Sequence, residues 1–100
     1  MRIPIASLPL GQQRCFSFDA TSVLVLRTDS AIFAIENVCP HSEFPLFGGA
    51  VAGETITCPV HGAQFDLNSG ASLTNKRLDP IRTYATRVED GFVVLSRVDA

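Results

Sequence analysis

Two short boxes contain most of the side chains in this chain that can bind a soft metal ion. Cys39-Pro40-His41 and Cys58-Pro59-Val60-His61 hold two of the three cysteines and both histidines, and the sixteen residues 42–57 separate them. Thiolate and imidazole groups bind soft or borderline metals, and ligands one or two residues apart can converge from a tight turn. The pattern therefore predicts a metal site formed by Cys39, His41, Cys58 and His61.

The distribution of the two ligand types indicates which metal centre to expect. Zinc modules usually pair cysteine with cysteine in one box and histidine with histidine in the other, whereas each box here is mixed. A mixed pair suits a dinuclear iron–sulfur site in which one iron binds both cysteines and the other binds both histidines. A structural zinc module that binds another protein is the alternative from a different class.

The four residues and their spacing resemble the Rieske [2Fe-2S] proteins. The resemblance continues through His61-Gly62-Ala63-Gln64-Phe65-Asp66 and the following Asn68-Ser69-Gly70, which are similar to the family's second cluster loop and the turn after it. It implies one [2Fe-2S] cluster per chain, bound by Cys39, His41, Cys58 and His61, with the two histidines at the solvent-exposed tip of the domain. A glycine beside a ligand, such as Gly62, would let backbone N–H groups approach the cluster sulfurs.

The sequence departs from the respiratory members of that family at four positions. Those members carry a disulfide that braces the cluster, and the corresponding positions here are Phe44 and Val60. They also have a serine and a tyrosine that donate hydrogen bonds to the cluster and its cysteine sulfur, where this chain has Ala63 and Phe65. Fewer donors stabilise the reduced state less, so a low reduction potential is expected.

A protein of this size and pattern is similar to the ferredoxin components of bacterial aromatic ring-hydroxylating dioxygenase systems. The resemblance implies a cytoplasmic one-electron carrier, not itself an enzyme, that serves aromatic hydrocarbon catabolism. Its partners would be a flavoprotein NAD(P)H-dependent ferredoxin reductase and a terminal oxygenase. The small subunit of an NADH-dependent nitrite reductase, which resembles Rieske domains of similar length, is the alternative with the same chemistry.

Composition limits the other classes of function. The net charge is −2 and the eight basic residues are scattered, so nucleic-acid binding is not expected. No apolar run approaches the length that crosses a membrane. An odd number of cysteines argues against a disulfide framework and agrees with a cytoplasmic location. Cys15 is expected to be a small buried hydrophobic residue with no chemical role.

The apolar residues occur in short blocks without a helical period, which predicts an all-β fold. We expect one domain over residues 1–100, a small antiparallel sandwich or barrel with a loop-rich cluster-binding subdomain, about residues 37–80, inserted in it. Asp90-Gly91 predicts a tight hairpin turn, and Thr28-Asp29-Ser30 a second one. Strands are expected over residues 15–18, 23–27, 31–36, 54–58, 63–66, 83–89 and 92–97.

The first loop also carries the apolar run Phe44-Pro45-Leu46-Phe47. These side chains would either form part of a docking patch, or cover the cluster from water, or fill the core.

Overall fold

The computed structural model describes residues 1–18, 20–29, 31–40, 44–60, 62–74 and 79–97. Within these ranges every regular element except one short 3-10 helix is a β-strand, so the predicted all-β class is confirmed. That helix has three residues, and no helix among the described residues is long and apolar enough to cross a membrane. In chain order the elements are β1 (Arg2–Pro4), η1 (Ile5–Ser7), β2 (Gln13–Phe18), β3 (Thr21–Arg27), β4 (Ile32–Glu36), β5 (Val51–Ala52), β6 (Thr55–Thr57), β7 (Gln64–Asp66), β8 (Thr83–Glu89) and β9 (Phe92–Arg97).

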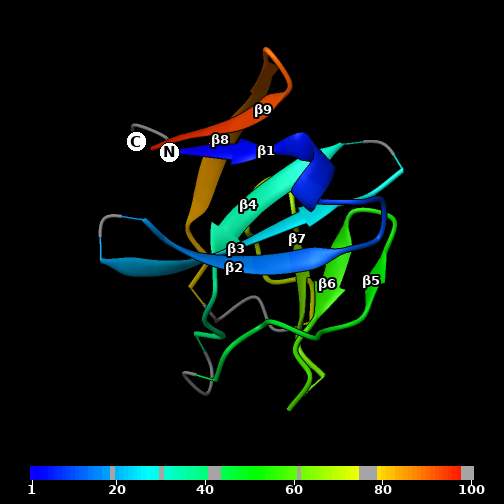
Figure 1. Cartoon of the computed structure of the whole chain (residues 1–100). Helices are drawn as coiled ribbons and strands as arrows, with labels where there is room; N and C mark the ends of the chain where they lie inside the picture. Colours follow the sequence, from blue (N-terminus) through cyan, green and yellow to red (C-terminus); the bar gives the residue numbers. More distant parts are fainter. Residues whose placement is uncertain (19, 30, 41–43, 61, 75–78, 98–100) are drawn as a thin grey trace.

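The strands form two antiparallel sheets that curl into a half-barrel (Figure 1). The larger sheet has six strands in the order β1-β9-β8-β4-β3-β2, and the smaller has three in the order β5-β6-β7. The small sheet comes from the loop-rich segment between β4 and β8.

Strand β3 shows why the large sheet forms where it does. Its residues Val23, Leu24, Val25 and Leu26 are all buried, because both faces of the sheet are covered. Side chains alternate between the two faces of a strand, so Leu24 and Leu26 pack toward the small sheet while Val23 and Val25 pack on the opposite face. The continuous apolar run therefore becomes a central strand of a sheet buried on both sides.

Local turn signals predicted the β8–β9 hairpin correctly. Both strands have the predicted bounds, and Asp90 and Gly91 between them have φ values of 52° and 79°. Two consecutive residues with positive φ make the turn that matches the twist of the flanking strands. The β3–β4 pairing is confirmed as well; Ser30 of its predicted turn lies outside the described residues.

Neither the first strand nor β5 was predicted. β1 is an edge strand that pairs with β9, with Arg2 opposite Val94 and Pro4 opposite Phe92. Proline is tolerated in such a strand because an edge position does not need every N–H group for the ladder. The short apolar stretch that contains Pro4 therefore forms a strand because it pairs with β9.

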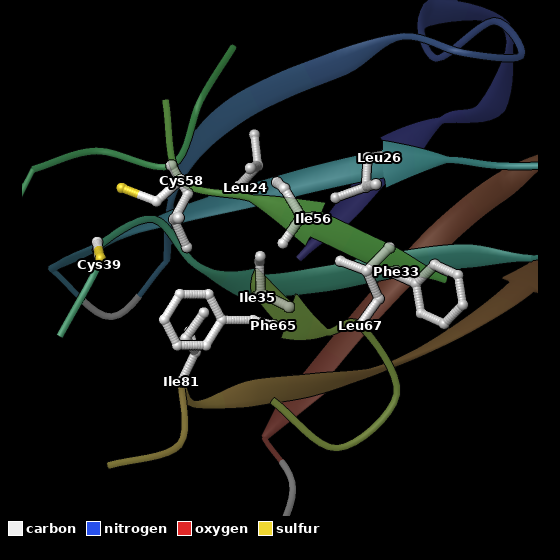
Figure 2. Packing of buried hydrophobic residues seen from close by; sticks show 11 residues of the cluster. Leu24, Leu26, Phe33, Ile35, Cys39, Ile56, Cys58, Phe65, Leu67 and Ile81 are labelled. Atoms are coloured by element: carbon white, nitrogen blue, oxygen red, sulfur yellow. The ribbon is translucent and has the colours of Figure 1, made fainter. Parts of the chain in front are cut away.

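Two clusters of buried side chains stabilise the fold. The cluster between the sheets, which we call the inter-sheet core, combines side chains from both sheets (Figure 2). It consists of Leu24, Leu26, Phe33, Ile35, Cys39, Leu46, Ile56, Cys58, Phe65, Leu67 and Ile81. The second cluster lies on the other face of the large sheet and includes Ile3, Val25, Tyr84 and Val93. Both cysteine loops lie at one end of the molecule, far from β1 and β9 (Figure 1).

We expect truncation of the inter-sheet core to destabilise the protein strongly. Ile56 is fully buried, and Ile→Ala in a core costs ~2–5 kcal/mol. Since 1 kcal/mol shifts the melting temperature of a domain of this size by roughly 4–8 °C, Ile56→Ala should melt about 10 °C lower or more. Val88→Ala, at a side chain that is 57% exposed, is the control and should melt near the wild type. Equal melting temperatures for the two variants would contradict this assignment of the core.

Candidate metal centre

Two of the predicted ligands, Cys39 and Cys58, are buried at the same end of the inter-sheet core. Cys39 follows β4 and Cys58 follows β6 directly, and their exposed fractions are 0% and 1%. Figure 2 shows both sulfur atoms at that end, beyond Leu24 and Phe65. The other two predicted ligands, His41 and His61, lie outside the described residues.

The two cysteine loops are closed by equivalent backbone hydrogen bonds. The N–H of Cys39 donates to the carbonyl oxygen of Phe44 at 2.8 Å, and the N–H of Cys58 donates to the carbonyl oxygen of Ala63 at 2.7 Å. Each bond joins a cysteine to the fifth residue after it. The two loops, sixteen residues apart in sequence, therefore present their cysteines from the same kind of turn.

Gly62 completes the second loop as a turn residue. Its φ is +73°, a conformation that side-chain-bearing residues rarely adopt. Its N–H donates to the carbonyl oxygen of Cys58 at 3.0 Å, so this donor is used within the turn and not for a sulfur atom. Gly62 was expected to let backbone N–H groups approach the cluster sulfurs, but its own N–H group is therefore not one of them.

A close backbone approach joins the two loops. A side chain on Gly49 would collide with the carbonyl oxygen of Thr57, the residue before Cys58. The N–H of Thr57 in turn donates to the carbonyl oxygen of Ala50 at 2.9 Å. Glycine is required here for close contact. The end of the first loop, at Gly49, consequently lies directly against the strand that leads into the second cysteine loop.

The residues after the second box include a core side chain and a turn. Phe65 is fully buried in the inter-sheet core, and its ring points toward the end that holds the two sulfurs (Figure 2). It offers no hydroxyl group. The predicted turn at 68–70 is present, and the side-chain hydroxyl of Ser69, 2.8 Å from the Asp66 carboxylate, lowers the pKa of that carboxyl group.

The predicted burial of Cys15 is wrong. Cys15 is exposed, and it lies on β2, an edge strand of the large sheet. Its sulfur accepts a hydrogen bond from the side-chain amide of Asn37 at 3.4 Å, and partial burial raises the pKa of its thiol. All three cysteines are described, and none forms a disulfide.

The apolar run of the first loop divides into two groups. Leu46 is fully buried in the core, as the core-filling interpretation predicts. Phe44 and Phe47 are each 50% exposed, and Val60 of the second loop is 49% exposed. Half-exposed apolar side chains thus project from both cysteine loops.

Asn37 and Gln13 were not predicted, yet both hold the first loop through side-chain hydrogen bonds. Asn37 lies two residues before Cys39, and this position is the only signal of its role in the sequence. Nothing local marks Gln13, which is 35 and 36 residues away from its partners.

The described half of the donor set fits an iron–sulfur centre. Cys39 and Cys58 are buried thiols at one end of a shared core, and neither forms a disulfide. Thiolates are the ligands that iron–sulfur clusters take from proteins.

Comparison with known proteins decides the family. The model of the Rieske [2Fe-2S] domain matches residues 3–85. The chain belongs to this family. The 3-phenylpropionate/cinnamic acid dioxygenase ferredoxin subunit of Escherichia coli K12 is 29% identical to it over 99 residues, 97% of this chain and 92% of that protein. The ferredoxin of carbazole 1,9a-dioxygenase from Nocardioides aromaticivorans IC177 is also 29% identical, with a TM-score of 0.88 and coverage of 98% and 97%.

Two further solved structures share the fold at lower identity. A ferredoxin solved in complex with the oxygenase of carbazole 1,9a-dioxygenase is 24% identical, with a TM-score of 0.84 over 94% of this chain and 88% of that one. A protein from Mycobacterium tuberculosis described as an NADH-dependent nitrite reductase small subunit is 24% identical, with a TM-score of 0.87 and coverage of 98% and 93%. At this identity the likeness establishes the fold alone.

Burial predicts which cysteines of this Rieske domain react with an alkylating agent. In the native protein we expect iodoacetamide to modify Cys15 and to spare Cys39 and Cys58. The rate should rise steeply with pH, because the thiolate is the nucleophile and partial burial raises the pKa of the Cys15 thiol. Peptide mass spectrometry would locate the adduct, and Cys15→Ser is the control. Native modification of Cys39 or Cys58 at the Cys15 rate would contradict the burial of the two box cysteines.

Proposed function

We propose that this Rieske domain is a one-electron carrier that binds one [2Fe-2S] cluster through Cys39, His41, Cys58 and His61. The observation that carries the proposal is the placement of Cys39 and Cys58, buried at one end of the core in equivalently closed loops. In each box a histidine follows the cysteine at the spacing that the family uses. When bound, the cluster accepts and releases single electrons.

The chain's own residues would insulate one side of this centre and leave the other accessible. The inter-sheet core closes off the side on which Cys39 and Cys58 lie. Electron transfer would then occur at the loop end, where Phe44, Phe47 and Val60 expose apolar surface. Half-exposed aromatic and aliphatic side chains suit a docking contact that forms and dissociates in each turnover.

The partners that we propose follow from the relatives. The named ferredoxins belong to dioxygenase systems, and one is solved in complex with its oxygenase. We therefore infer a terminal ring-hydroxylating oxygenase as electron acceptor and a flavoprotein NAD(P)H-dependent ferredoxin reductase as donor. The carrier itself would catalyse no reaction on a substrate. The cytoplasmic location stays a prediction.

We also infer that residues 1–100 form one domain with residues 37–80 as its inserted subdomain. Support comes from the inter-sheet core, in which Leu24 and Ile35 of the large sheet pack with Ile56 and Phe65 of the small one.

The alternatives are less well supported. A nitrite reductase small subunit shares the fold at 24% identity, whereas relatives at 29% identity are dioxygenase ferredoxins. A structural zinc module is disfavoured by the mixed boxes and by membership in the Rieske family.

Electron paramagnetic resonance tests the proposed centre directly. After anaerobic purification and reduction with dithionite, we expect a rhombic signal with a low average g value, as mixed cysteine and histidine ligation gives. His41→Cys and His61→Cys, which change the ligand type on one iron, should each alter this spectrum. Bound zinc without iron would overturn the carrier function.

The missing hydroxyl group at Phe65 gives a second prediction. Phe65→Tyr should raise the reduction potential, because a new hydrogen bond to a cysteine sulfur stabilises the reduced state. A bond that strengthens by ~1 kcal/mol on reduction corresponds to a rise of about 40 mV for one electron. Redox titration with Phe33→Tyr as the control would measure it, since Phe33 lies in the same core but away from the two sulfurs (Figure 2). An unchanged or lowered midpoint for Phe65→Tyr would contradict the proposed tuning.

A further inference from the structure

The described residues of the first cysteine loop form no strand ladder of their own. It runs from the end of β4 at Glu36 to the start of β5 at Val51, and it crosses from the large sheet to the small one. The second loop, in contrast, is the turn of the β6–β7 hairpin, where Thr57 pairs with Gln64. Long irregular segments in compact domains need other anchors, so the position of Cys39 relative to Cys58 requires additional contacts.

Two side-chain amides provide those contacts at residues 46–49, which we call the return segment. The Asn37 Oδ1 accepts the N–H groups of Leu46 and Phe47, both at 2.9 Å. The Gln13 Oε1 accepts the N–H of Gly48 at 2.9 Å, and its Nε2 donates to the carbonyl oxygen of Gly49 at 2.8 Å. Four consecutive residues of the return segment are therefore bound through their backbone by only two side chains.

Both amides are anchored in the large sheet. Gln13 begins β2. The backbone N–H of Asn37 donates to the carbonyl oxygen of Ser22 in β3 at 2.9 Å, and its Nδ2 donates to the Ser22 hydroxyl at 3.2 Å and to the Cys15 sulfur at 3.4 Å. The orientation of each amide is fixed by its partners, because only the oxygen atom can accept from a backbone N–H group.

We propose that Asn37 and Gln13 are positioning residues of the metal centre, whose amides fix the return segment to the large sheet and so hold Cys39 in register with Cys58. The chain of contacts is continuous. The return segment places Leu46 in the inter-sheet core, to which both cysteines also belong, and its last residue, Gly49, lies against Thr57, which precedes Cys58. The inference rests on the proposed ligation by the two boxes.

The chemistry of the two amides differs in a way that a test can use. Asn37 serves the return segment only as an acceptor, so Asn37→Asp keeps both of its bonds to the loop and strengthens them by charge. It loses the donor bond to the Cys15 sulfur, while the Ser22 hydroxyl can donate to the carboxylate in place of accepting from the amide. Gln13 serves as acceptor and donor, so Gln13→Glu keeps the bond to Gly48 but places a carboxylate oxygen against the carbonyl oxygen of Gly49. We therefore expect Asn37→Asp to keep the metal centre stable and Gln13→Glu to weaken it.

The test measures how fast iron leaves the oxidised holoprotein to a chelator. We expect Asn37→Leu, Gln13→Leu and Gln13→Glu to release iron about tenfold faster than the wild type, which corresponds to ~1.4 kcal/mol in the barrier. The same variants should broaden the electron paramagnetic resonance signal of the reduced centre. Asn37→Asp should stay within about twofold of the wild type, since its two acceptor bonds remain. Thr86→Val is the matched control, because it removes one hydrogen bond, to Ile32 at the far end of β4.

The outcomes separate positioning from general destabilisation. Release rates in the Leu variants that match the wild type, or that match Thr86→Val at equal loss of melting temperature, would overturn the proposal. If Asn37→Leu does not fold, the two Gln13 variants decide, because Gln13 lies on an edge strand and is partly exposed. If the wild type binds no cluster, the proposed function fails, and hydrogen exchange of the Leu46, Phe47 and Gly48 amides still tests the two amides: protection that persists without Asn37 or Gln13 would overturn them as anchors.

Discussion

The architecture depends on packing the small sheet against the large one so that two cysteines, from separate loops, are buried at one end of the same core. Cys39 and Cys58 are as buried as the leucine and isoleucine side chains around them. Burial of apolar surface drives this packing. The same packing places both cysteines at one end of the core. The contacts around Ile56, Phe65 and Leu46 consequently both stabilise the fold and shape the metal centre.

The two loops reach that end by different physical means. Hairpin pairing holds the second loop, whose cysteine directly follows β6. The first loop is longer and links two sheets, and ordering such a segment costs more conformational entropy. Hydrogen bonds from Asn37 and Gln13 to the return segment, together with the burial of Leu46, offset that cost. The respiratory members of the family carry a disulfide at the positions of Phe44 and Val60. Here those two side chains are half-exposed, and non-covalent contacts brace the first loop.

Function follows from a contrast between the two sides of the loop end. Toward the protein, the cysteines lie among closely packed apolar side chains that exclude water. Toward the solvent, Phe44, Phe47 and Val60 expose apolar surface on both loops. A buried redox site close to such a surface suits rapid transfer to a partner, and the absence of hydroxyl groups at Ala63 and Phe65 suits a carrier of low potential.

The features that depend on near neighbours along the chain could be predicted from residue types and spacing. Residue types and spacing in the two boxes predicted the centre, and Asp90-Gly91 predicted a hairpin whose strands have the expected bounds. Tertiary structure decided the rest: the pairing of Arg2 with Val94, the exposure of Cys15 on an edge strand, and the reach of Gln13 to Gly49 across 36 residues. Periodicity and turn chemistry act over a few residues, whereas edge positions and side-chain anchors exist only once distant strands have packed.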